Sequence, residues 1–116
     1  MGRLSTHVLD TVAGKPAEGV VIVLARLLDD CSWQQIVEVK TNADGRTDQP
    51  MLIGDTFSVG TYMLTFHIGD YFKRGGGTTS AFLDVIPIRF TITEPDGHYH
   101  VPLLATPWSY STYRGS

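Results

Sequence analysis

The chain contains several short segments in which apolar and polar residues alternate strictly, and this pattern limits the fold more than any other feature. The clearest example is the segment 86–93, where isoleucine or phenylalanine occupies every second position. A period of two is that of a β-strand with one buried and one solvated face. No segment shows a sustained 3.6-residue apolar period, so the chain is predicted to be built from strands.

Further strands are predicted where β-branched and aromatic residues lie between turn signals. They cover residues 4–10, 20–25, 33–41, 59–68, 99–105 and 109–114. The continuous apolar run 20–25 is typical of a strand that is covered on both faces. Only the segment 69–74 is compatible with a helical turn or two. We therefore expect an all-β sandwich of seven to eight strands with one short helix.

Length and composition exclude several classes of protein. The 116 residues fit a single domain spanning 1–116, and the hydrophobic fraction of 42% is ordinary for a globular chain. The net charge of −3 and the scattered basic residues do not favour nucleic-acid binding. No apolar run approaches the roughly 20 residues that a membrane helix needs. We expect neither nucleic acid nor membrane as a partner.

The N-terminus and the cysteine content indicate a compartment. The first residues include no apolar run of the kind that a secretory signal requires. The single Cys31 has no partner for an internal disulfide. A cytoplasmic protein is the simplest expectation.

Alternation also gathers histidines on outward faces. In the strand that follows the turn Pro95-Asp96-Gly97, Tyr99 and the residues at every second position after it suit the core, which leaves His98 and His100 outward. In the first strand, Thr6 and Val8 point inward and His7 points outward by the same rule. The outward positions 102 and 104 are proline and leucine, and this apolar character suggests that a partner subunit covers the face. The fourth histidine, His67, is expected to face solvent.

These residue types suit proton transfer near neutral pH. Imidazole has an unperturbed pKa of about 6.5 and can act as a general base. Arg46, which follows an Asp-Gly turn, offers a fork of donors for carbonyl oxygens. Three histidines could also bind zinc, but the sequence supplies no obvious carboxylate or thiolate beside them, and we expect no metal. The residues by themselves support a β-sandwich with a candidate polar site.

Four segments of the chain resemble the 5-hydroxyisourate hydrolase family, also called transthyretin-related proteins. They are LSTHVLD at 4–10, TNADGRT at 41–47, HYHVPLL at 98–104 and YSTYRGS at 110–116. The closing Tyr-Arg-Gly-Ser separates this hydrolase family from transthyretin, which it otherwise resembles in fold. The stretch 73–84, with its three consecutive glycines, departs from the usual pattern.

The resemblance implies a transthyretin-like (prealbumin-like) sandwich that assembles as a homotetramer, a dimer of dimers with a central channel. Carried over position by position, it implies His7, Arg46 and His100 as the catalytic set. It implies that the substrate is also bound by residues beside that set and in the tail: His98, Ser111, Tyr113, Arg114 and Ser116.

The implied reaction is hydrolysis of the N1–C6 ring amide of 5-hydroxyisourate, a product of urate oxidation, to 2-oxo-4-hydroxy-4-carboxy-5-ureidoimidazoline, without a cofactor. The main alternative is a transthyretin-like carrier of a small aromatic ligand. A structural or adhesion-type sandwich is a third possibility, but it predicts no concentration of histidines on one face.

Overall fold

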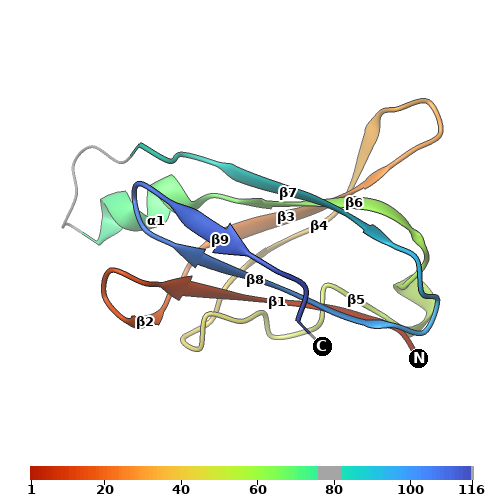
Figure 1. Cartoon of the computed structure of the whole chain (residues 1–116), viewed down its shortest axis with the longest axis horizontal. Helices are drawn as coiled ribbons and strands as arrows, with labels where there is room; N and C mark the ends of the chain where they lie inside the picture. The colour runs from red at the N-terminus through yellow and green to blue at the C-terminus, as the bar shows by residue number, and fades with distance from the viewer. Residues whose placement is uncertain (76–81, 116) are drawn as a thin grey trace.

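Two antiparallel-rich sheets pack face to face in the computed structural model, which describes residues 1–75 and 82–115 (Figure 1). One sheet contains β1 (Arg3–Asp10), β2 (Lys15–Pro16), β5 (Leu52–Ile53), β8 (His98–Ala105) and β9 (Tyr110–Thr112). The other contains β3 (Val21–Leu27), β4 (Trp33–Lys40), β6 (Gly60–Phe66) and β7 (Ile86–Ile92). The 3-10 turn η1 (Gly54–Thr56) and the helix α1 (Ile68–Arg74) complete the fold.

The predicted all-β sandwich with one short helix is confirmed, with differences of detail. Each of the seven longer strands overlaps a predicted segment, and the two-residue strands β2 and β5 were not predicted. The last strand ends at Thr112, two residues earlier than expected. The three-glycine loop of the sequence lies largely outside the described residues.

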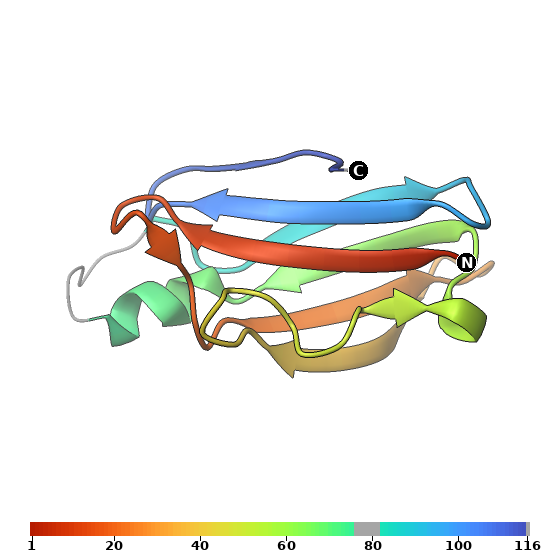
Figure 2. The ribbon, with the colours of Figure 1, turned by 90° about the horizontal axis from the view of Figure 1, so that it is seen from below.

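One prediction about β3 is wrong. Its apolar run suggested cover on both faces, yet only Ile22 and Leu24 are fully buried, whereas Val21 and Val23 are half-buried. The reason is that a two-layer sandwich covers each sheet on its inner face only. Within this chain, the outer face of β3 has no layer above it (Figure 2).

The core lies between the two inner faces. In the first sheet, Leu4, Val8 and Leu103 have no exposed surface, and Leu24 and Leu64 have none in the second. Removing apolar side chains from water is the main favourable contribution to folding. The period-two pattern of the sequence therefore sets which face of each strand turns inward.

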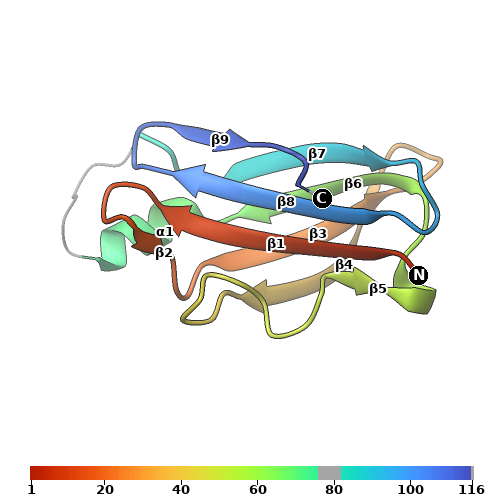
Figure 3. The ribbon, with the colours of Figure 1, turned by 60° about the horizontal axis from the view of Figure 1, so that its bottom comes forward.

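The centre of the first sheet is a parallel pair formed by β1 and β8, strands from opposite ends of the chain (Figure 3). The register aligns Arg3 with His98, Ser5 with His100 and His7 with Pro102. β9 then turns back antiparallel along the free side of β8. This pairing brings the N-terminal and C-terminal polar motifs onto one surface.

Candidate active site

The outer face of β1 and β8 carries the polar side chains that alternation placed there. His7 and His100 are half-buried and His98 is exposed, whereas Thr6 and Tyr99 are buried on the inner face. The ring centroids of His7 and His100 lie 6.5 Å apart. The apolar part of this face is less open than expected, because Pro102 is buried and Leu104 is half-buried within the single chain, where β9 pairs with β8. His67 is half-buried before α1, outside this group.

The turn that follows β4 delivers Arg46 to the same surface. The Asn42 side chain accepts hydrogen bonds from the backbone N–H groups of Asp44, at 2.9 Å, and Arg46, at 3.2 Å. Gly45 adopts φ of 73°, and a Cβ there would lie 2.4 Å from the Val8 carbonyl oxygen. Only glycine fits this approach to β1. The tight contact sets Arg46 opposite His7 in an antiparallel bridge.

Hydrogen bonds orient both imidazoles. His7 Nε2 lies 2.9 Å from the Asp44 carbonyl oxygen. A carbonyl can only accept, so Nε2 of His7 carries the proton and Nδ1 of the neutral ring holds a lone pair. His100 Nδ1 lies 2.9 Å from Ser5 Oγ, a hydroxyl that can donate or accept. The contact therefore orients the His100 ring and is compatible with either neutral tautomer.

Both imidazoles are held toward their neutral form. Burial lowers the pKa of His100, and the positive charge of Arg46 lowers it further, with smaller contributions from His7 and Arg3. Burial and Arg46 also lower the pKa of His7, and they outweigh the raising effect of the Asp44 carbonyl. A neutral imidazole at neutral pH can take a proton from water.

Two adjoining hollows open beside these groups. One, of about 300 Å³, is lined by Arg3, Ser5, Arg46, His98, Tyr99 and His100. The other, of about 210 Å³, shares Arg3, Ser5 and Arg46. Sequence reasoning missed Arg3 and left Ser5 without a role. The signal was available, since a period of two counted back from His7 reaches Ser5 and then Arg3 on the same face.

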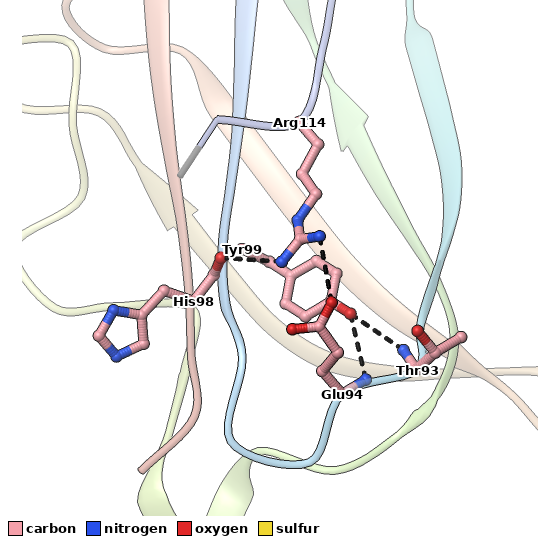
Figure 4. Close-up of polar contacts among 5 residues, drawn as sticks. All are labelled: Thr93, Glu94, His98, Tyr99 and Arg114. Carbon is pink, nitrogen blue, oxygen red and sulfur yellow. Dashed lines mark hydrogen bonds and ion pairs between the residues drawn. The ribbon is translucent and has the colours of Figure 1, made fainter.

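The structure separates the residues of the tail. Ser111 lies in β9 opposite Leu104 of β8, and Tyr113 follows β9. Both are exposed, and neither lines the two hollows. Arg114 points elsewhere, with its guanidinium over the ring of Tyr99 (Figure 4). Ser116 lies outside the described residues. His98 lines the larger hollow, and its Nε2 donates to the Met1 carbonyl oxygen at 3.2 Å.

Other features of the fold do not compete with this site. A larger hollow of about 550 Å³ beside α1 is lined by Asp10, Tyr71 and Arg74 among others, but by no histidine. Among the described residues, no three histidine, cysteine, aspartate or glutamate side chains are placed to hold a metal ion. No helix within residues 1–75 and 82–115 is long and apolar enough to cross a membrane.

Comparison with known proteins gives a consistent result. A protein of Deinococcus radiodurans named 5-hydroxyisourate hydrolase is 54% identical over 116 residues, which cover 97% of this chain and 95% of the relative. The solved 5-hydroxyisourate hydrolase of Klebsiella pneumoniae superimposes with a TM-score of 0.83 at 37% identity, over the full length of both chains.

Transthyretin from Sparus aurata also superimposes, with a TM-score of 0.89 at 31% identity, covering 97% of this chain and 96% of that one. The fold is therefore shared by a transthyretin and a 5-hydroxyisourate hydrolase, and the fold by itself does not separate the two. The family model described as HIUase/Transthyretin family matches residues 4–115. On this match and these identities, the chain belongs to the HIUase/Transthyretin family.

Proposed function

We propose that this protein is a 5-hydroxyisourate hydrolase that opens the N1–C6 amide of its substrate without a cofactor. One observation carries the proposal: the His100 imidazole and the Arg46 guanidinium line one hollow, and the His7 ring lies beside them, with its centroid 6.5 Å from that of His100. The pKa of both His7 and His100 is lowered. The relative with that name is 54% identical to this chain over nearly its full length. A carrier of an apolar ligand has no need of such a group, since burying polar groups against it costs free energy.

The mechanism assigns one task to each of the three groups. His100 removes a proton from water, which attacks the C6 carbonyl of the ring, and Arg46 donates to the oxygen that gains negative charge. The N1–C6 bond then breaks, and the proton passes to N1 while C6 becomes a carboxylate. His7, with its lone pair on Nδ1, helps to hold the water.

Ser5 can accept a hydrogen bond from the tautomer that this role requires. If His100 is to accept a proton at Nε2, its Nδ1 must carry hydrogen and donate to Ser5 Oγ, 2.9 Å away. The same contact fixes the ring plane. Arg3, which lines both hollows, adds a second positive charge for the carbonyl-rich substrate.

The remaining residues named from the resemblance act at the rim. His98 lines the larger hollow and contacts the substrate from the N-terminal end of β8. The family resemblance supports a role for Ser111, Tyr113 and Ser116 in closing the pocket from the tail, although Ser111 and Tyr113 do not line the hollows of the single chain.

Assembly into a homotetramer, a dimer of dimers, completes the pocket. β7 and β9 end their respective sheets, and their outer edges lie on the same side of the sandwich (Figure 1). Unpaired edge strands are templates for pairing with another chain. Sedimentation across a range of concentrations tests this part, and a monomer with full turnover would contradict it.

The cytoplasm is the proposed compartment, since Cys31 is an exposed free thiol of the kind that a reducing environment preserves. Fractionation of the source cells tests this assignment.

The decisive experiment is a turnover assay in which urate oxidase generates 5-hydroxyisourate in place and its ultraviolet band is followed. A hydrolase speeds the decay catalytically, with many turnovers per subunit, and a chelator leaves the rate unchanged. A carrier instead retains or protects a stoichiometric amount of the compound. Decay at the spontaneous rate in the presence of folded protein would reject the hydrolase.

A further inference from the structure

The C-terminal tail, residues 113–115, returns to the edge of β8 after β9 has ended. The Gly115 N–H donates to the His100 carbonyl oxygen at 2.7 Å, and the His100 N–H donates to the Gly115 carbonyl oxygen at 3.4 Å. β9 pairs Thr112 with Leu103. Gly115 stands three residues after Thr112 and His100 three before Leu103, so the bridge keeps the register of the ladder. Residues 113–114 do not pair with β8, and the chain pairs with β8 again at His100, the proposed general base.

Gly115 also touches the side chain of His100. A Cβ built on Gly115 would lie 3.0 Å from His100 Cδ2 and 3.2 Å from His100 Cβ. The tail backbone therefore packs directly on the imidazole, and a Cβ at this position would require the ring to move by a few tenths of an ångström. Since Ser5 binds Nδ1 of the same ring, the imidazole is held by two groups at once.

Arg114 lies on the other face of the tail. Side chains alternate along an extended chain, so the neighbour of Gly115 turns away from His100. Its guanidinium carbon lies 4.0 Å from the centroid of the Tyr99 ring. Nη1 donates to Glu94 Oε1 at 3.4 Å and Nη2 donates to the His98 carbonyl oxygen at 3.4 Å (Figure 4).

The platform beneath this guanidinium is rigid. Tyr99 is 5% exposed, and its hydroxyl accepts hydrogen bonds from the backbone N–H groups of Thr93, at 3.1 Å, and Glu94, at 3.2 Å. Stacking over an aromatic face and a charge-assisted hydrogen bond both suit arginine rather than lysine. A side chain on a fixed ring restricts the backbone that carries it.

We propose that Arg114 is a positioning residue that acts through Gly115 to hold the His100 imidazole in its working orientation, rather than a direct ligand of the substrate. The inference rests on the proposed hydrolase function and refines it. The guanidinium is engaged with Tyr99, Glu94 and the His98 carbonyl, and Arg114 lines neither hollow beside His100. Its effect on the reaction is therefore indirect and is transmitted through the adjacent residue, Gly115.

The test compares Arg114→Gln with the unaltered protein in two independent ways. Steady-state kinetics should show kcat lower by about tenfold to a hundredfold, with KM within a factor of two, because misplacing a catalytic group by an ångström has effects of that size. Nuclear magnetic resonance of labelled protein should show the Gly115 amide exchanging about tenfold faster or more, and altered ring signals of His100.

Two further variants should reduce kcat by less than Arg114→Gln does, and a third variant serves as a control. Arg114→Lys keeps the charge but loses the planar stack, and it should restore part of kcat. Glu94→Gln removes the acceptor's charge and should give a smaller loss than Arg114→Gln. Arg74→Gln removes another exposed arginine that donates to a backbone carbonyl, that of Gly19, at the opposite end of the molecule, and it should change neither readout.

Two outcomes would overturn the proposal. A higher KM for Arg114→Gln with kcat and Gly115 exchange unchanged would make Arg114 a substrate ligand. Unchanged kinetics together with unchanged exchange would remove it from the site. If the unaltered protein fails to hydrolyse 5-hydroxyisourate, the proposed function fails, while the exchange of Gly115 and the His100 signals still decide whether Arg114 holds the tail.

Discussion

The two sheets of the sandwich are alike on their inner faces and very different on their outer faces. Inward, β8 and β6 both present fully buried leucines, Leu103 and Leu64. Outward, the β1–β8 surface carries Arg3, His7 and His100, whereas β3, β4, β6 and β7 contain no histidine. On the second outer face, the guanidinium carbon of Arg89 lies 5.3 Å from the centroid of the Trp33 ring.

This contrast shows that the inner faces of the strands stabilise the fold, whereas the outer face of the first sheet carries the candidate catalytic groups. Inner positions need apolar volume, which many residues supply, and so both sheets satisfy the same requirement. Outer positions are free of that requirement and can carry reactive groups. Of the two sets of described strands, only those of the first sheet, in which the two ends of the chain meet, carry histidines on the outer face.

The largest expected effect is that of His100→Ala. It removes the proposed base from the outer face of β8 and should lower kcat/KM for 5-hydroxyisourate by about 10²–10⁴-fold. His67→Ala, which removes a half-buried histidine outside the cluster, is the matched control and should retain full turnover. A folded His100→Ala tetramer with the activity of the unaltered protein would end the proposed mechanism.

Inner-face substitutions should affect the two sheets equally. Leu103→Ala and Leu64→Ala each open a cavity under a side chain with no exposed surface, and each should reduce the free energy of unfolding by about 2–5 kcal/mol. Urea denaturation followed by circular dichroism measures both. The two inner faces are not equivalent if the free energy of unfolding falls by several kcal/mol in one variant and hardly changes in the other.

Arg46→Lys tests the shape of the cation rather than its charge. Lysine keeps the positive charge but cannot present two parallel donors to the substrate, so kcat/KM should fall by about tenfold to a hundredfold. Arg89→Lys makes the same change on the outer face of the other sheet and should leave kcat/KM unchanged. Equal kinetics in both variants would remove Arg46 from the site.

The smallest effect is expected from Arg3→Gln. Arg3 contributes to the lowered pKa of His100, so its removal favours the imidazolium form and raises that pKa toward its ordinary value. Because the base works only when neutral, the acidic limb of kcat/KM should move to higher pH, and the loss at neutral pH should be about fivefold or less. Lys40→Gln removes an exposed charge from the second sheet and should leave the limb where it is. If the acidic limb of kcat/KM does not move in Arg3→Gln either, Arg3 does not influence the pKa of His100.

A large part of the fold could be predicted because it depends on local alternation. The inward turn of Thr6, Val8 and Tyr99 is confirmed, and so is the outward turn of His7 and His100. The wrong prediction for β3 arose because burial on both faces does not depend on local alternation. An apolar run reports that burial is possible, but whether a second layer exists above a strand depends on the rest of the chain.

The candidate site could be predicted only in part. The resemblance named His7, Arg46 and His100, and the structure places them together, although their catalytic roles stay predictions. Ser5 was placed on the outward face without a role and Arg3 was not named, because their contacts with His100 and the hollow arise from a strand pairing across 95 residues. The direction of Arg114 was also hidden, since its partners Tyr99 and Glu94 come from another part of the chain.

The sequence by itself determined which side chains face the core and which face outward, because a strand's period is fixed by its backbone. It also determined the turn at Gly45, where a positive φ requires glycine. Only the tertiary structure decided that β1 lies parallel to β8, that Arg46 meets His7, and that the tail packs on His100. The physical reason is that these contacts join distant segments, and their free energy depends on the whole packed core rather than on any local pattern.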